Sequence, residues 1–204
     1  MVAIIDYDAG NIKSVEKAIQ FLGKEAVITR DAEQILSASH VILPGVGAFG
    51  DAMGKLQNYG LIPVIHEVVK RQIPFLGICL GLQLFFERSE ETPGVEGLGI
   101  LKGEIKRIPD GEDLKIPHIG WNSLSIKQKD TLFKDIPENA YVYFVHSYYL
   151  HAEDENDIAT VTNYGIDFHS AVGKNNIFAT QFHPEKSGEV GLSILRNFAS
   201  MEVK

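Results

Sequence analysis

The chain has 204 residues, 45% of them hydrophobic and 23% charged, which is ordinary for a globular protein of one domain. Its 19 basic and 27 acidic side chains leave a net charge of -8, which argues against a nucleic-acid-binding or anionic-membrane surface. A single cysteine excludes an internal disulfide and suits a reducing compartment. The start of the chain lacks a basic segment, and no stretch reaches the roughly 18 apolar residues of a membrane span, so we expect a cytoplasmic protein without a signal peptide.

The first half of the chain alternates predicted strands with predicted helices. Apolar runs bounded by turn residues predict four buried strands, at residues 2–5, 26–29, 40–43 and 75–78. Apolar residues spaced as on one helical face predict helices at residues 12–22, 61–70 and 80–87. Asp31 followed three residues later by Gln34 predicts the capped start of a further short helix. This alternation predicts a mostly parallel sheet covered by helices on both faces.

The second half consists mostly of predicted strands. They lie at residues 100–108, 116–126, 140–146, 157–162, 168–172 and 177–182. Their short, Gly-, Asp- and Asn-rich separations predict many antiparallel pairs, residues 89–97 are expected to form a surface loop, and a helix at 188–201 closes the chain. We therefore expect one mixed α/β domain over residues 1–204, with a mostly parallel central sheet flanked by helices and an antiparallel-rich C-terminal half.

Cys79 stands between a predicted strand and a predicted helix, in the segment Gly-Ile-Cys-Leu-Gly. Gly77 and Gly81 flank it as in a nucleophile elbow. Glycines relieve the crowding of a sharp strand-to-helix turn, and the first N–H groups of the helix favour a thiolate and a developing oxyanion. The alternative is a buried structural cysteine, the usual fate of an unpaired one. The pattern favours a nucleophile.

His183 and Glu185 lie in the segment Phe-His-Pro-Glu-Lys near the end of the chain. A cysteine nucleophile needs a base, and the base needs an orienting group. Pro184 biases His183 toward extended backbone, in which residues two apart point to the same side. Glu185 would then orient His183 and leave its other nitrogen for Cys79. A capped turn without catalytic meaning is an equally good interpretation of this segment alone, because only the fold can join it to Cys79.

Residues 44–50 read Pro-Gly-Val-Gly-Ala-Phe-Gly and contain the dinucleotide-binding pattern G-x-G-x-x-G. The segment follows the third predicted strand rather than the first and precedes a possible helix, and no acidic residue closes a further strand at the expected interval. We therefore favour a loop that offers a backbone N–H to an oxyanion beside Cys79. The glycines of the Gly45-Val46-Gly47 stretch permit a peptide flip at small steric cost, so this donor is a candidate switch.

The seven histidines show no metal-ligand spacing, and we expect neither a metal nor a cofactor. His118, His146 and His151 are more simply structural or solvated side chains than metal ligands. The aromatic run 143–149 is most simply a core strand. Trp121, among turn-forming residues, is either a core residue or, if exposed, an interface anchor.

Six motifs occur in order along the chain, at residues 6–11 (DYDAGN), 44–49 (PGVGAF), 77–83 (GICLGLQ), 117–122 (PHIGWN), 146–148 (HSY) and 183–186 (HPEK). On these motifs the chain resembles the class I (triad) glutamine amidotransferases, and among them the glutaminase subunits of imidazole glycerol phosphate synthases, over almost its whole length. Leu82 is a departure, since these subunits often have Met there and other amidotransferases often have His. This argues against a glutaminase of the anthranilate or guanylate pathways.

The resemblance implies a catalytic triad. Cys79 would attack the side-chain amide of glutamine, His183 would take the thiol proton and protonate the leaving ammonia, and Glu185 would orient His183. A γ-glutamyl thioester would then hydrolyse to glutamate. The resemblance also implies an oxyanion hole and a glutamine-binding set, formed by Gly45, Val46, Gly47, Leu80, Gln83, Ser147 and Tyr148.

The resemblance names the partner as the (β/α)-barrel cyclase subunit, with which the chain would form a heterodimer for imidazole glycerol phosphate synthesis in histidine biosynthesis. The glutaminase domain accounts for the whole length given, so we expect no acceptor domain. Ammonia released into neutral water becomes ammonium and loses its nucleophilicity, so a partner must receive it directly. We expect the partner to bind through Trp121, Asn122 and Lys186.

Three alternatives remain open on the sequence. A cysteine peptidase or small thiol hydrolase could use the same triad. The glutaminase of pyridoxal phosphate synthesis has a similar size and a barrel partner, but its early Gly-Gly-Glu-Ser loop is absent here. A degenerate, non-enzymatic amidotransferase is disfavoured by the intact Cys79, His183 and Glu185.

Overall fold

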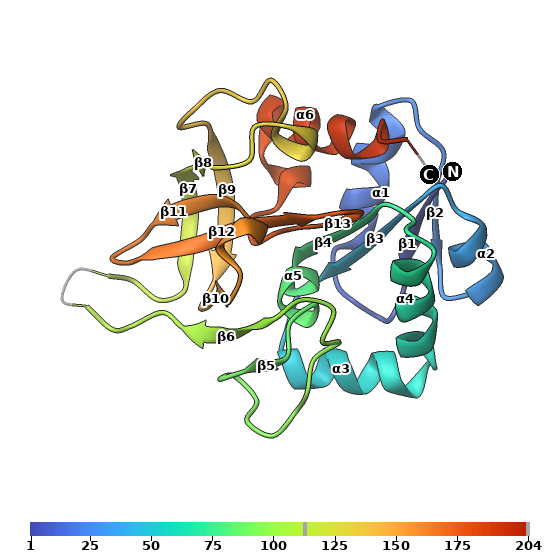
Figure 1. Ribbon diagram of the computed structural model, residues 1–204, viewed down its shortest axis with the longest axis horizontal. Coiled ribbons are helices and arrows are strands. Elements are labelled where there is room, and N and C mark those ends of the chain that lie inside the picture. Colours follow the sequence, from blue (N-terminus) through green and yellow to red (C-terminus); the bar gives the residue numbers. More distant parts are fainter. Residues whose placement is uncertain (112–113, 203–204) are drawn as a thin grey trace.

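A computed structural model describes residues 1–111 and 114–202. A long twisted sheet runs through the molecule, with helices on both faces and a small second sheet beside it (Figure 1). The helices are α1 (Ile12–Phe21), α2 (Ala32–Ser37), α3 (Phe49–Asn58), α4 (Leu61–Lys70), α5 (Leu80–Leu84) and α6 (Gly188–Ala199), with 3-10 turns η1 (Thr131–Phe133), η2 (Glu155–Asp157) and η3 (Pro184–Lys186). The expected mixed α/β class is confirmed.

The large sheet has 11 strands in the described part of the chain. The strands are β1 (Val2–Ile5), β2 (Ala26–Thr29), β3 (His40–Gly45), β4 (Phe75–Cys79), β5 (Arg88–Ser89), β6 (Gly103–Arg107), β8 (Ser125–Ile126), β10 (Tyr148–Ala152), β11 (Ile158–Asn163), β12 (Asp167–Lys174) and β13 (Ile177–Thr180). Along β2-β1-β3-β4-β13 all pairs are parallel, and β12 begins the antiparallel part. β7 (His118–Ser123) and β9 (Tyr141–His146) form the small antiparallel sheet.

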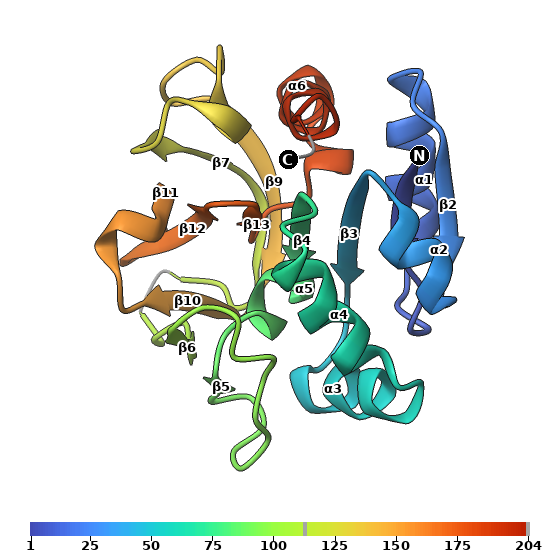
Figure 2. The same ribbon diagram turned by 45° about the vertical axis from the view of Figure 1, so that its right-hand side comes forward.

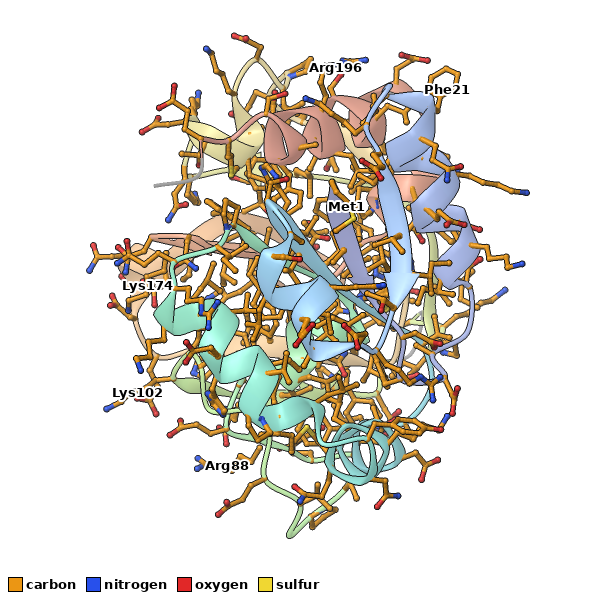
Figure 3. The ribbon with its side chains drawn as sticks, turned by 90° about the vertical axis from the view of Figure 1, so that its right-hand side faces the viewer. Met1, Phe21, Arg88, Lys102, Lys174 and Arg196 are labelled. Carbon is orange, nitrogen blue, oxygen red and sulfur yellow. The ribbon has the colours of Figure 1, made fainter. Side chains whose placement is uncertain are left out.

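Successive side chains along the parallel strands point to opposite faces of the sheet, and so they form two separate hydrophobic cores. Ala3 and Ile5 of β1 face one core with α2, α3, α4 and α5, whereas Val2 and Ile4 face the other with α1 and α6. In Figure 2, α1 and α6 lie on one side of β3 and β4, and α4 and α5 lie on the other. The small sheet packs into the second core through Val142 of β9. Charged side chains such as Arg88, Lys102 and Lys174 project outward (Figure 3).

Most of the predicted elements are present, with shifted ends. α2 has the expected cap, since the Asp31 carboxylate accepts a hydrogen bond from the Gln34 N–H at 2.9 Å. α5 ends at Leu84 rather than residue 87, because the chain turns there to bring Leu98 onto the Leu84 carbonyl. β3 continues through Pro44 and Gly45, which pair with β4 instead of stopping the strand. α3, only a possible helix from the sequence, carries two glycines that lower its helix propensity.

The aromatic run 143–149 is two strands rather than one. β9 ends at His146, and β10 begins at Tyr148 and pairs with β6 in the large sheet. Trp121 lies within β7, and it is 56% exposed, so it is not a core residue. None of the helices in the described ranges combines the length and hydrophobicity that crossing a membrane requires.

Candidate active site

Cys79 occupies the turn between β4 and α5 in a strained conformation. Its φ of 55° and ψ of -107° lie outside the regions that a non-glycine residue ordinarily adopts. Such strain persists only where the surrounding structure enforces it, and it is concentrated at functional sites. The expected elbow is therefore present: β4 delivers Cys79 to the end of the parallel strands, and α5 starts with Leu80.

Three glycines allow this elbow to form. A Cβ on Gly77 would lie 2.8 Å from the Gly81 carbonyl oxygen, and a Cβ on Gly81 would lie 2.9 Å from the Leu43 carbonyl carbon. A Cβ on Gly45 would overlap the Tyr7 hydroxyl and lie 2.9 Å from the Leu80 Cβ. Side chains at these positions would push α5 away from β3 and β4. The glycines thus set the position of Cys79.

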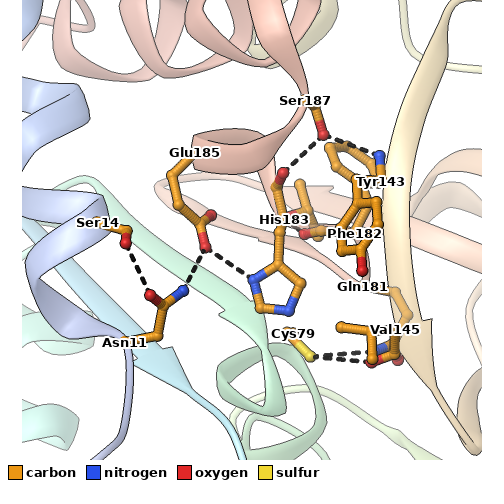
Figure 4. A network of polar contacts seen from close by, with 11 residues as sticks. Asn11, Ser14, Cys79, Tyr143, Val145, Gln181, Phe182, His183, Glu185 and Ser187 are labelled. Carbon is orange, nitrogen blue, oxygen red and sulfur yellow. Dashed lines mark hydrogen bonds and ion pairs between the residues drawn. The ribbon is translucent and has the colours of Figure 1, made fainter. Parts of the chain in front are cut away.

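His183 and Glu185 meet Cys79 from the far end of the chain. β13 pairs with β4 in parallel, Thr180 opposite Ile78, which brings the residues after β13 next to the elbow. His183 Nδ1 lies 2.8 Å from Glu185 Oε1, and its ring points toward the Cys79 sulfur (Figure 4). The expected extended backbone holds only for His183, because Pro184 opens the 3-10 turn η3 that carries Glu185. That turn, rather than strand alternation, brings the two side chains together.

The electrostatics of this trio favour a protonated imidazole on His183. Burial by itself would lower the pKa of His183, but the Cys79 sulfur and the Glu185 carboxylate outweigh it and raise the pKa to about 10. The His183 and Glu185 side chains are only 2% and 1% exposed. Among buried side-chain atoms of the described residues, only His183 Nε2 and Glu185 Oε2 have no hydrogen-bond partner. Nε2 is thus available to the sulfur and to a ligand.

A cavity of about 280 Å³ opens beside the Cys79 sulfur. Its walls hold eight of the residues expected at the site, which are Val46, Gly47, Cys79, Leu80, Gln83, Ser147, Tyr148 and His183. Gly45 and Glu185 lie behind the cavity wall, around a small void of about 10 Å³. The structure therefore brings all ten expected triad, oxyanion and glutamine-binding residues to one place.

Gln83 is held by neighbours rather than free in the cavity. Its amide nitrogen donates to the Tyr148 carbonyl at 3.2 Å and to Gln181 Oε1 at 3.2 Å. Gln181 in turn directs its amide nitrogen at the Cys79 sulfur, 3.8 Å away. Both hydrogens of the Gln83 amide are thus engaged, so this side chain braces the cavity wall at Tyr148.

Two further residues belong to the site although the sequence did not point to them. Glu91 lines the cavity from the segment 89–97, expected only as a surface loop, and its carboxylate accepts the Phe49 N–H at 2.7 Å. Tyr7 is buried and donates its hydroxyl to the Pro44 carbonyl at 2.8 Å, and burial and the nearby Cys79 raise its pKa above the ordinary range. Tyr7 lies within the motif 6–11, whereas Glu91 has no local signal.

The family model for class-I glutamine amidotransferases matches residues 3–201. The chain belongs to the class-I glutamine amidotransferase family. It is therefore an amidotransferase enzyme subunit, and the resemblance expected from the six motifs is confirmed.

Two relatives of this amidotransferase carry the name imidazole glycerol phosphate synthase subunit HisH. The one from Geobacter metallireducens is 51% identical over 203 residues, covering 97% of this chain and 97% of the relative. The one from Methanocaldococcus jannaschii is 49% identical over 201 residues, covering 98% of this chain and 100% of the relative. The chain is HisH-like over nearly its full length.

Solved structures agree with the amidotransferase fold. A crystal structure of a glutamine amidotransferase matches with a TM-score of 0.75 at 19% identity, covering 98% of this chain and 100% of that one. The PurLQS structure from Thermotoga maritima matches with a TM-score of 0.76 at 19% identity, covering 97% of this chain and 96% of the other. At this identity the likeness concerns the fold alone.

Of the three residues expected at a partner interface, two are exposed and one is held by hydrogen bonds within the fold. The Trp121 ring packs in a T-shaped arrangement with the Tyr143 ring and remains exposed. Lys186 is exposed, and its ammonium lies 5.9 Å from the Tyr143 ring centroid. Asn122 instead uses its side chain within the fold: its Nδ2 donates to the Asn163 carbonyl, and its Oδ1 accepts from the Ser123 N–H. In the described ranges no cluster of three or more metal-ligating side chains occurs.

Proposed function

We propose that this chain is the glutaminase subunit of an imidazole glycerol phosphate synthase and hydrolyses glutamine with Cys79, His183 and Glu185. The observation that carries the proposal is the strained Cys79 beside a buried imidazole–carboxylate pair, at the wall of a cavity. The names of the full-length relatives support the assignment to imidazole glycerol phosphate synthase. Residues 1–204 act as one glutaminase domain.

The reaction begins with the Cys79 thiolate attacking the amide carbon of glutamine. The new S–C bond converts the carbonyl into a tetrahedral oxyanion, which accepts hydrogen bonds from the Leu80 N–H and from one N–H in the Gly45-Val46-Gly47 loop. The imidazolium of His183 donates its Nε2 proton to the amide nitrogen, the C–N bond breaks, and ammonia leaves. Each oxyanion donor contributes roughly 2.7–4 kcal/mol to the transition state.

The second half of the reaction restores the thiolate. Neutral His183 accepts a proton from a water molecule as the water oxygen attacks the γ-glutamyl thioester. Collapse of this intermediate breaks the S–C bond and releases glutamate, leaving thiolate and imidazolium as at the start. Glu185 keeps Nδ1 protonated throughout, so that Nε2 is the nitrogen that exchanges protons.

The cavity has the chemistry that an amino acid requires. Among the described residues that line it, Glu91 is the one carboxylate, and it suits the α-ammonium group of glutamine. The backbone of Ser147 and Tyr148 lines the same wall and offers amide groups to the substrate. Gln83 holds that wall in place through the Tyr148 carbonyl. Glutamine would thus lie with its amide at Cys79 and its charged end toward Glu91.

Ammonia passes to a barrel-shaped cyclase subunit that docks on the small sheet. Ile119, Trp121 and Tyr141 are 60%, 56% and 59% exposed, and an apolar face of this kind marks a protein interface. Val145 of the same sheet pairs with Ile119 and lines the cavity, so a partner covering this face would close over the exit of the site. The single reactive thiol requires a reducing compartment, so we place the reaction in the cytoplasm.

The test is the substitution Cys79→Ala in the complex with the cyclase subunit. Glutamine hydrolysis should fall by at least about 10³-fold, because no other group can form the thioester. Synthesis driven by added ammonium should persist, because the acceptor chemistry belongs to the partner. Loss of both activities in an assembled complex would contradict this division. Hydrolysis of peptides by the chain alone would favour a peptidase instead.

A further inference from the structure

Two buried histidines beside the cavity take no part in the chemistry proposed above. His118 of β7 and His146 of β9 face each other in register, with His118 Nδ1 3.0 Å from His146 Nε2. They are only 3% and 6% exposed. A hydrogen bond between two imidazoles has a direction, because one ring must donate and the other must accept.

The hydrogen bond that His146 makes next to the cavity shows which of the two rings donates. His146 Nδ1 lies 2.9 Å from the Tyr148 carbonyl oxygen, which can only accept. His146 therefore carries its proton on Nδ1. Because a neutral imidazole has one N–H, its Nε2 is the acceptor, and His118 Nδ1 must be the donor.

The hydrogen bonds of Asn122, on the other side of His118, independently show that His118 Nδ1 is the donor. The Asn122 amide is oriented by two bonds, since Nδ2 donates to the Asn163 carbonyl at 2.9 Å and Oδ1 accepts the Ser123 N–H at 2.8 Å. Its second N–H points at His118 Nε2, 3.4 Å away. His118 Nε2 thus accepts, and His118 too carries its proton on Nδ1.

The surroundings keep both rings neutral. His118 stacks between Tyr164 and Phe144, with ring centroids 3.9 Å and 4.9 Å away. His146 packs on Phe144 and Phe168, at 5.5 Å and 5.1 Å. Burial lowers the pKa of His118 to about 4, and burial lowers that of His146 to about 3. Near neutral pH neither ring gains the second proton that would place two donors face to face.

The relay ends on groups that shape the cavity. The Tyr148 carbonyl accepts from His146 and also from Gln83, which binds Gln181, which in turn contacts the Cys79 sulfur. At the opposite end Asn122 adjoins Trp121 on the exposed face of the small sheet. One directed series of hydrogen bonds therefore connects strand β7 with the substrate wall.

We propose that His118 and His146 are positioning residues, which through this Nδ1–H relay hold the Tyr148 carbonyl and Gln83 in the geometry that binds glutamine. The proposal rests on the glutaminase function proposed above. The Nδ1–H donor of His118, rather than the bulk of its ring, fixes the orientation of His146. Without that donor, His146 Nε2 is a buried acceptor with no hydrogen-bond partner, which costs free energy. The His146 ring would then rotate to find another partner and lose its hydrogen bond to the Tyr148 carbonyl.

The first test reads the proton positions directly. Nitrogen NMR of the imidazole rings in the full chain at neutral pH should show both His118 and His146 with the proton on Nδ1. Free histidine side chains outside such networks serve as the internal reference. A proton on Nε2 of either ring would overturn the relay, since the two ends would then no longer be satisfied.

The second test compares three substitutions of His118 in glutaminase kinetics. His118→Asn places an amide N–H near the Nδ1 position, whereas His118→Gln places its amide near Nε2 and His118→Phe keeps only the stacking ring. The Gln and Phe variants should raise KM for glutamine on the order of 10-fold, the change that a lost buried hydrogen bond produces, with a smaller change in kcat. The Asn variant should stay close to the native KM.

Controls separate this proposal from simple packing and from the function itself. His40→Gln removes a ring that is 5% exposed and bonded to Ser39 and Met201 far from the cavity, and it should leave KM unchanged. If Phe is tolerated best and Asn worst, packing explains His118 and the relay is wrong. If the native complex fails to hydrolyse glutamine, the proposed function fails, whereas the NMR result still decides the proton positions.

Discussion

The substitution Gly81→Ala adds one methyl group to the second residue of α5. Gly81 is buried, and the new Cβ would lie 2.9 Å from the Leu43 carbonyl carbon and closer still to its oxygen. Both are backbone atoms of β3, a central parallel strand whose neighbours are β1 and β4. No rotation of a side chain relieves this overlap, so α5 must move away from β3 and take the residue at the elbow with it.

The expected effects follow from that displacement. The new Cβ would overlap the Leu43 carbonyl oxygen, so restoring ordinary contact requires a shift of more than about 1 Å. A misplacement of about 1 Å already costs on the order of 10²-fold in rate. Alanine improves helix propensity by up to about 1 kcal/mol, but overpacking of a core costs typically 1–3 kcal/mol. We therefore expect a net loss of unfolding free energy together with a fall of about 10²-fold in kcat for glutamine hydrolysis.

The measurements are urea unfolding and steady-state glutaminase kinetics of the complex. Gly54→Ala is the matched control, because Gly54 lies exposed within α3 and a Cβ there meets nothing within 4 Å. It should leave kcat unchanged and stabilise the chain by up to about 1 kcal/mol. A Gly81→Ala protein with native kcat would refute the argument that backbone contact between α5 and β3 positions the nucleophile.

Three further outcomes are expected. Trp121→Ala should weaken binding of the cyclase subunit by about 2 kcal/mol or more in a titration, since exposed aromatic anchors dominate interfaces, and unchanged affinity would remove Trp121 from the interface. The free energy of unfolding should fall as pH is lowered from about 6.5 to 5, because the unfolded chain protonates His118 and His146 near pH 6.5 while their native pKa values are about 4 and about 3. His118→Asn should flatten that slope, and an identical slope would contradict it. Partner and acceptor analogue together should raise kcat for glutamine by about 10²- to 10³-fold, if the Gly45-Val46-Gly47 peptide turns an oxyanion donor toward the site. Full turnover by the chain alone would rule out this switch.

The elements that the sequence predicted well are those set by short-range rules. α1 and α4 follow from apolar spacing, and α2 from the Asp31 cap. The elements that it missed depend on distant partners. The run 143–149 has uniform strand character, so the change of sheet at Ser147 is visible only once β10 pairs with β6. α3 was uncertain because its glycines weaken the local signal, and packing on α4 and α5 compensates.

The sequence by itself determined the chemical groups and the local geometry that they demand. Glycines on either side of Cys79 indicate an elbow, because only they fit a sharp strand-to-helix turn, and His-Pro-Glu indicates a paired imidazole. The tertiary structure alone decided what these groups meet. Parallel pairing of β13 with β4 brings Gln181 to the Cys79 sulfur from 102 positions away, and loop packing turns Glu91 into the cavity. Steric effects between neighbouring residues restrict only a short segment of the chain. Contacts between distant residues form because whole faces of the sheet are buried together, and a local sequence pattern does not predict them.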